Sequence, residues 1–229
     1  MQSVLTILNN EQLVQKVVID FERAVWVAVQ EKLPDATIQG CAFHWTQSLW
    51  RKIQDLGLQG AYSNDDAVFK FLRKVMTLPF LPATKIPGVF ERLRAQASST
   101  ALEDFMIYVA DQWIYNVFWC PENWSVFNQC VRTNNDIEGW HHRINRRASG
   151  KSHIPFYSLV GLLHQEAEIT SLHIRLVSEK KLKRNQRRSY RMVQGRVFKL
   201  WEEYEAGERS KWGLLKACAN LNYGPGRSV

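Results

Sequence analysis

The α/β character of the chain rests on one hexapeptide, Val17-Val18-Ile19-Asp20-Phe21-Glu22. Its apolar run predicts a buried strand from Lys16 to Asp20, which delivers a carboxylate to its tip. Apolar residues then recur at every fourth position from Phe21 to Leu33, which predicts a helix that ends at Pro34. Taken alone, Asp20 also fits the simpler role of a cap for that helix.

A second strand and a second helix follow. A short strand is expected at Thr37–Cys41, and a helix from about Phe43 to Leu56 comes directly after it. The order strand, helix, strand, helix favours parallel pairing of the two strands. The strand pattern then disappears from about residue 64 to residue 130. The helices expected in that stretch span 65–76, 89–96 and 102–115.

A helix start that carries a carboxylate is predicted in Arg132-Thr133-Asn134-Asn135-Asp136-Ile137-Glu138-Gly139-Trp140-His141. Asn135 is placed to act as N-cap, with Glu138 three residues on as the second member of a capping box. This helix is expected to run to Ala148. Two long helices are expected within 155–205, and the second of them is very basic.

Basic charge is concentrated in the C-terminal part. The formal net charge of the whole chain is +8. Between Trp140 and Leu200 there are 14 Lys or Arg and three acidic residues, so this segment carries +11 and the rest of the chain −3. One-sided charge of this size suits a polyanionic partner, and a merely solvated basic face is the alternative.

Composition excludes several classes of protein. A hydrophobic content of 45% is ample for a core, which excludes a disordered tail. No apolar run reaches the roughly 18 residues that a membrane-spanning helix needs, so no membrane partner is expected. The first ten residues lack the basic region of a secretory signal. Four irregularly spaced cysteines favour a reducing, intracellular compartment over a disulfide framework.

Three stretches together resemble the catalytic core of Mutator-like element (MULE) transposases, which are of the ribonuclease H-like Asp-Asp-Glu type. They are Ile19–Glu22, Gly40–Lys52 and Arg132–His141. The second and third stretches are fairly specific, and the first alone would be weak. The resemblance covers roughly residues 16–205.

This resemblance implies an α/β, mostly helical fold. It consists of a truncated ribonuclease H-like core with its first strands missing, a large all-helical insertion and a helical, basic C-terminal part. The corresponding division is an uncertain lead-in at 1–15, the partial core at 16–60, the insertion at 61–131, the Glu-bearing helix and basic helices at 132–205, and a tail at 206–229.

The resemblance also implies the site residues. Asp20 corresponds to the family's second catalytic Asp and Glu138 to its Glu, so both would bind Mg²⁺ or Mn²⁺ in a two-metal DNA cleavage and strand-transfer reaction. Cys41 and His44 correspond to the family's Cys-x-x-His motif and would support that site. A zinc site is not expected, because the sequence has no second tight pair of Cys or His ligands.

DNA is the expected partner and the nucleus the expected location, and self-association is left open. Phosphate contacts are expected from the basic run of the second long helix, which gives affinity without sequence specificity. The basic residues of this run are Lys180, Lys181, Lys183, Arg184, Arg187, Arg188 and Arg191.

One part of the family's pattern is not matched. The family's first catalytic Asp lies on a strand several tens of residues before the second, and residues 1–19 contain no Asp. Because two carboxylates hold two metal ions poorly, we expect little or no strand transfer from this chain by itself. The alternatives are a non-catalytic nucleic-acid-binding protein and a protein-interaction module. An upstream segment that supplies the first Asp would favour the enzyme.

Overall fold

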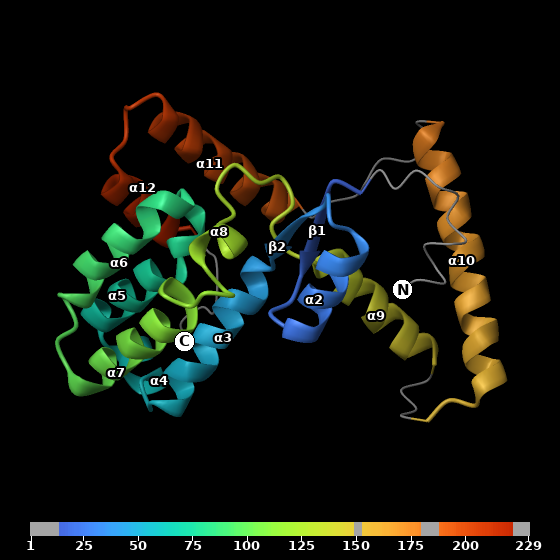
Figure 1. Cartoon of the computed structure of the whole chain (residues 1–229), viewed down its shortest axis with the longest axis horizontal. Helices are drawn as coiled ribbons and strands as arrows, with labels where there is room; N and C mark the ends of the chain where they lie inside the picture. Colours follow the sequence, from blue (N-terminus) through green and yellow to red (C-terminus); the bar gives the residue numbers. More distant parts are fainter. Residues whose placement is uncertain (1–13, 149–152, 180–187, 222–229) are drawn as a thin grey trace. The chain divides into compact units, whose positions relative to one another are not determined.

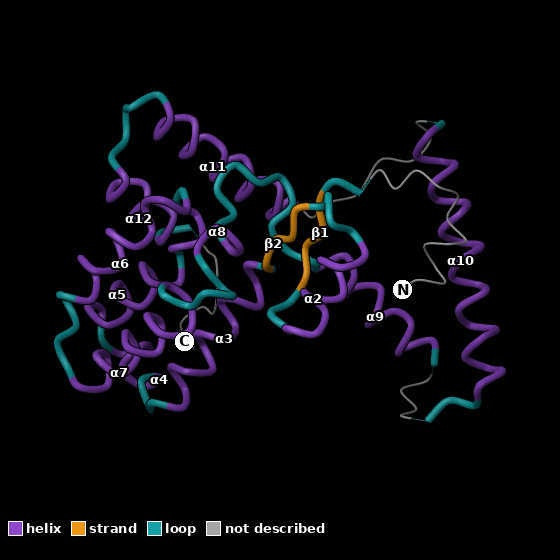
Figure 2. Tube along the Cα trace, in the orientation of Figure 1, coloured by secondary structure: helices purple, strands orange, loops and turns teal. Residues whose placement is uncertain are grey.

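The computed structural model describes residues 14–148, 153–179 and 188–221 (Figure 1). These residues form two compact units. The first comprises the described residues up to Thr133 and from Val193 onward, and the second runs from Asn134 to Met192. Helices predominate, and the described part of the chain contains one small parallel sheet (Figure 2). The predicted α/β, mostly helical class is confirmed.

The first unit begins with the expected alternation of strands and helices. Its first four elements are β1 (Lys16–Ile19), α2 (Arg23–Lys32), β2 (Thr37–Gly40) and α3 (Ala42–Asp55). β1 and β2 pair in parallel, with Lys16 opposite Thr37 and Ile19 opposite Gly40. The predicted strands and their parallel pairing are therefore confirmed.

A helical stretch follows α3, as predicted. It contains α4 (Gln59–Asn64), α5 (Asp66–Met76), α6 (Ile86–Arg94), α7 (Thr100–Val109) and α8 (Pro121–Trp124), with short helical turns at Leu78–Phe80, Ala83–Lys85 and Ala110–Ile114. Side-chain caps fix two of the helix starts. The Asp65 carboxylate accepts the Ala67 N–H of α5 at 2.7 Å, and the Ser99 hydroxyl accepts the Leu102 N–H of α7 at 3.3 Å.

The C-terminal helices α11 (Arg188–Glu205) and α12 (Lys211–Ala219) add to the first unit from Val193 onward. The division drawn from the sequence did not anticipate α12, which lies inside the expected tail. Its residues Leu214, Leu215 and Cys218 are buried in the core, and the helix packs on α5.

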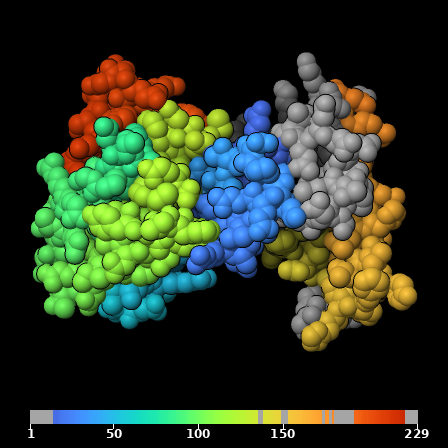
Figure 3. Space-filling view, viewed as in Figure 1, coloured from blue at the N-terminus to red at the C-terminus, as the bar shows by residue number. Residues whose placement is uncertain are grey.

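Buried tryptophans join the helical part of the first unit to its α/β part. Trp45 of α3 stacks on Trp124 of α8 with ring centroids 5.0 Å apart, and both side chains are fully buried. Trp201 of α11 is equally buried, and its indole N–H donates to the Phe80 carbonyl oxygen at 2.9 Å. Large aromatic side chains dominate the energetics of a core of this kind. In the space-filling view, the blue α/β residues and the green helical residues adjoin (Figure 3).

The second unit is built on α9 (Asn135–Arg147) and α10 (Phe156–Ser178). The predicted helix after Arg132 is confirmed, but the predicted capping box is wrong. The N-cap is Asn134 rather than Asn135, and its side chain makes no capping hydrogen bond. Its φ of −92° and ψ of 22° lie outside the extended region that a capping residue adopts. Among the described residues, none of the helices combines the length and apolarity needed to cross a bilayer.

Candidate functional site

Asp20, Cys41 and His44 come together at one edge of the small sheet. Asp20 directly follows β1, Cys41 directly follows β2, and His44 lies in the first turn of α3. Parallel strands end at the same edge, so the register that pairs Ile19 with Gly40 brings the next residue of each strand to that edge. The Cys41 N–H extends the pairing by donating to the Ile19 carbonyl oxygen at 2.8 Å.

The three side chains present an oxygen, a sulfur and a nitrogen to one another. Asp20 Oδ1 and His44 Nδ1 lie 2.7 Å apart, which is hydrogen-bonding distance. One donor atom from each of the three residues lies within 4.8 Å of the other two. Cys41 is fully buried, whereas the side chains of His44 and Asp20 are 22% and 49% exposed. The cluster is thus closed on the thiol side and reached by solvent on the carboxylate side.

Aromatic packing fixes the backbone at Asp20. The Trp26 indole N–H donates to the Asp20 carbonyl oxygen at 2.6 Å. The Phe21 ring packs edge-on against Trp113 and Trp119, with centroids 4.6 and 5.5 Å away. The strand end that carries the carboxylate is therefore held by the aromatic core.

The start of α3 is anchored through Arg132. The Ala42 N–H donates to the Arg132 carbonyl oxygen at 2.9 Å. The Arg132 side chain is buried, and its guanidinium carbon lies 5.8 Å from the ring centroids of both Phe80 and Trp201. Desolvated cation–π contacts of this kind contribute about 2 kcal/mol. Arg132 thus links the backbone beside Cys41 to the aromatic core.

Glu138, the second predicted catalytic carboxylate, lies in α9 of the second unit. Its backbone N–H donates to the Asn134 carbonyl oxygen at 3.2 Å in the first turn of the helix, and the residue is half-buried. Its approach to Asp20 stays a prediction. Within the first unit the described donors beside Asp20 are a thiol and an imidazole, and this set does not fit Mg²⁺, which takes oxygen ligands.

A buried carboxylate clamps α9 to α10. Glu166 of α10, with a side chain only 3% exposed, accepts hydrogen bonds from Arg143 at 2.7 Å, from Arg147 and from the Trp140 indole at 3.1 Å. The Arg143 hydrogen bond in particular holds the pKa of Glu166 below its ordinary value, although burial acts in the opposite direction. Two arginines of α9 therefore serve the internal structure of the second unit.

Most of the predicted phosphate-binding run lies outside the described residues, namely Lys180, Lys181, Lys183, Arg184 and Arg187. Arg188 and Arg191 belong to the first turns of α11, but their side chains are also outside the description. Within the described part of the basic segment, exposed side chains that carry positive charge include Arg146, Arg196 and Lys199.

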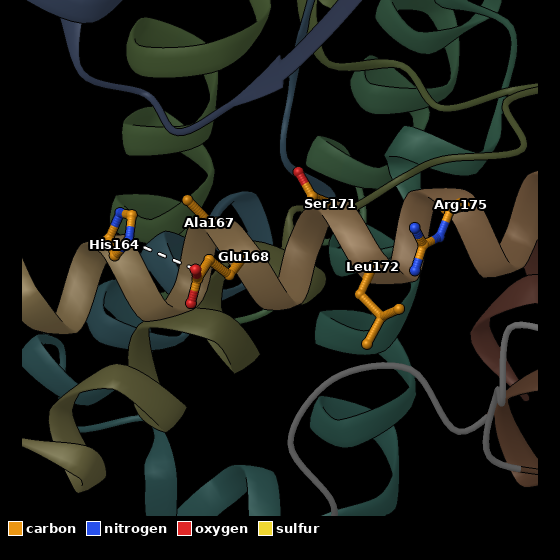
Figure 4. A pocket seen from close by; sticks show the side chains of 6 residues that line it. All are labelled: His164, Ala167, Glu168, Ser171, Leu172 and Arg175. Atoms are coloured by element: carbon orange, nitrogen blue, oxygen red, sulfur yellow. Dashed lines mark ion pairs between the residues drawn. The ribbon is translucent and has the colours of Figure 1, made fainter.

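A shallow depression of about 560 Å³ lies along α10 (Figure 4). Its lining residues are His164, Ala167, Glu168, Ser171, Leu172 and Arg175. All six come from one exposed helix, and His164 Nε2 lies 3.6 Å from Glu168 Oε1 across one turn. Among the described residues, the lining comes from one helix and lacks the convergent polar groups of a binding cavity.

Two features of these sites escaped the sequence interpretation. The zinc argument from the sequence required a second pair of Cys or His residues and did not weigh Asp20 as a donor, although the parallel register brings Asp20 beside Cys41 and His44. The sequence interpretation assigned Glu166 no role beyond its charge. The pattern that could have revealed its role is that Glu166 lies on the same helical face as half-buried Leu162 and Ile169, where a single buried carboxylate requires charged partners.

Comparison of the chain with family models, with curated proteins and with solved structures found no match.

Proposed function

We propose that this chain is a transposase-derived domain that binds DNA through its basic C-terminal part and performs little or no strand transfer by itself. The observation that supports it best is the setting of Asp20. This carboxylate directly follows a parallel strand, lies beside Cys41 and His44, and is followed by a large helical stretch. The resemblance to MULE transposases implies this setting for the second catalytic Asp.

The expected lack of strand transfer follows from the carboxylates that the chain contributes. Two-metal cleavage of DNA needs several carboxylates around the ions. Asp20 and Glu138 are the matching residues, and residues 1–19 add no Asp. The thiol of Cys41 and the imidazole of His44 are poor substitutes, since Mg²⁺ and Mn²⁺ favour oxygen ligands.

DNA binding is supported by the charge of +11 between Trp140 and Leu200. Arg143 and Arg147 are engaged by Glu166, so they contribute less to a phosphate surface than their number suggests. We expect the run from Lys180 to Arg191 to make most of the phosphate contacts. Such contacts would make the affinity strongly dependent on salt and nearly independent of DNA sequence.

The test is fluorescence anisotropy of labelled duplex DNA with the purified chain across a salt series. A triple variant, Lys180→Gln with Lys181→Gln and Arg184→Gln, should reduce the slope of log K against log salt by about 2.7, at roughly 0.9 per phosphate contact. The matched control neutralises the exposed lysines Lys32, Lys70 and Lys85 and should leave the slope unchanged. Equal effects of the two variants, or no binding by the unmodified chain, would refute the proposal.

Cleavage is measured in the same samples with Mn²⁺ present. We expect intact DNA at every salt concentration. Cleavage that Glu138→Gln abolishes would contradict the proposal, because it would mean that the chain holds a complete set of catalytic carboxylates.

A protein-interaction module is the second candidate, and α10 favours it. Phe156, Tyr157 and Val160 at the start of this helix are 71%, 86% and 47% exposed. Exposed aromatic residues of this kind are typical of protein-interaction surfaces. If DNA binding fails, Phe156→Ser with Tyr157→Ser should abolish self-association in sedimentation velocity runs, and unchanged sedimentation would exclude this use of α10.

A further inference from the structure

We propose that Asp20, Cys41 and His44 form a binding site for Zn²⁺. The site takes one ligand from the residue after β1, one from the residue after β2 and one from the first turn of α3. This inference is independent of the proposed function, because it rests on three side chains of the first unit and on neither DNA binding nor Glu138.

The donor chemistry selects the metal. Thiolate and imidazole are ligands that zinc prefers, and a carboxylate oxygen completes zinc sites in many proteins. Mg²⁺ demands a shell of six oxygens and keeps most of its waters, so the sulfur of Cys41 and the nitrogen of His44 both disfavour it. The cluster therefore prefers a softer ion than the one that the transposase resemblance implies.

The spacing of the donors also suits zinc. Zinc–ligand bonds of about 2.0–2.3 Å in a tetrahedron place the ligand atoms roughly 3.3–3.6 Å apart. The three donor atoms already lie within 4.8 Å of one another. His44 Nδ1 and Asp20 Oδ1, now 2.7 Å apart, would need to separate by roughly 0.6 Å. Side-chain torsions of Asp20 suffice for this change, because that side chain is 49% exposed.

The backbone is well prepared for such a site. The Cys41 N–H bond to the Ile19 carbonyl fixes the two strand ends relative to each other, and the Trp26 indole holds the Asp20 carbonyl. Three protein ligands leave a fourth position for water, and the exposed side of Asp20 gives an ion its path from solvent. Zinc would join the ends of β1 and β2 to the first turn of α3.

The inference also bears on Asp20 as a transposase residue. A carboxylate bound to zinc beside a thiolate is not available to a pair of hard ions. Zinc binding would therefore oppose DNA cleavage by the chain, and it would leave the proposed phosphate contacts of the basic segment unchanged.

The experiment uses Co²⁺ as a spectroscopic substitute for Zn²⁺ on the whole purified chain. We expect one Co²⁺ per chain, with the near-ultraviolet absorption that a thiolate ligand gives to cobalt and the visible bands of a tetrahedral ion. Stoichiometric Zn²⁺ should remove both, and a large excess of Mg²⁺ should remove neither. A chain that shows no thiolate absorption, or that releases Co²⁺ to Mg²⁺, would overturn the proposal.

Three variants locate the ion. Cys41→Ser should remove the thiolate absorption, and Asp20→Asn should weaken zinc binding more than about 100-fold, since losing only an outer partner of a ligand costs about 10–100-fold. Cys130→Ser, which alters an exposed cysteine that is not a member of the cluster, should change neither property. Circular dichroism confirms that each variant is folded. Because Asp20 is half-exposed, Asp20→Asn keeps the test valid if the buried Cys41 variant unfolds. Unchanged zinc affinity in Asp20→Asn would overturn the site.

Discussion

A single added methyl group at Gly40 should destabilise the first unit severely. An ideal Cβ at Gly40 would lie 2.4 Å from Cε1 and from Cζ of the Phe21 ring, and 3.2 Å from the Asn123 carbonyl oxygen. The ring has little freedom to withdraw, because Trp113 and Trp119 pack edge-on against it at centroid distances of 4.6 and 5.5 Å. The Gly40→Ala substitution therefore overpacks a site that is closed on several sides.

The magnitude follows from that crowding. Overpacking a core costs about 1–3 kcal/mol, and we expect the upper end, about 3 kcal/mol, because both an aromatic ring and a backbone oxygen obstruct the methyl group. In a chain of 229 residues, this loss corresponds to a fall in Tm of roughly 6–12 °C. The effect is opposite in sign to the usual gain when alanine replaces glycine in an unstrained position.

Thermal unfolding followed by tryptophan fluorescence measures this effect in the first unit, which holds eight of the nine tryptophans. Gly88→Ala is the matched control, because Gly88 is an exposed residue of α6 where an added Cβ would meet no atom within 4 Å apart from its own helix backbone. Helix propensity predicts that this control gains up to about 1 kcal/mol.

A double-mutant cycle tests the cause. Phe21→Leu makes room near Gly40, so the double variant should be more stable than the sum of the two single effects predicts. Strict additivity, or a Gly40→Ala protein that melts like the unmodified chain, would refute the reasoning.

Three other predictions follow from buried groups. The Arg143 hydrogen bond lowers the pKa of Glu166 from 4.5, so its stabilising contribution is present above pH 4.5 and is lost as the pH falls through the lowered pKa. Amide exchange in α9 and α10 should accelerate in that acid range, and unchanged protection would count against the clamp. Burial raises the pKa of the Cys218 thiol to about 12, so alkylation of the native chain should modify exposed Cys130 first and reach Cys218 only on unfolding, as mass mapping would show. Equal labelling of both thiols would be inconsistent with the buried position of α12. Trp201→Ala should cost about 3–5 kcal/mol in urea unfolding, because the core loses a large ring and the Phe80 carbonyl loses its donor, and a loss under about 1 kcal/mol would contradict this packing.

Elements with a strong local pattern could be predicted from the sequence. The apolar run before Asp20 and the turn residues after Leu33 mark β1 and α2 within a few positions. The parallel pairing of β1 with β2 followed from the order of the elements. The cap of α9 could not be predicted to the residue, because Asn134 and Asn135 are adjacent and both are good capping residues.

Contacts made by the tertiary structure were harder to predict. α12 has only nine residues, and its apolar Leu214 and Leu215 stand next to each other in a chain end that resembles a tail. Its place in the core depends on a partner, α5, that is distant in sequence. The meeting of Asp20 with Cys41 likewise depends on strand register, which is a property of two segments together and not of either alone.

The environment of Arg132 has a consequence for how the chain is built. The polypeptide leaves the first unit just after this residue and re-enters it at Val193, in the helix that carries Trp201. Trp201 lies about two helical turns beyond the re-entry point and contacts the Arg132 guanidinium. The segments where the chain leaves and re-enters the first unit are therefore joined by one cation–π contact, between Arg132 and Trp201. Residues 134–192 are therefore an insertion whose two ends are already held together by the first unit, so the entropy cost of bringing these ends together rises only slowly with the length of the insertion. Evolution could lengthen, shorten or replace this insertion without changing the core of the first unit.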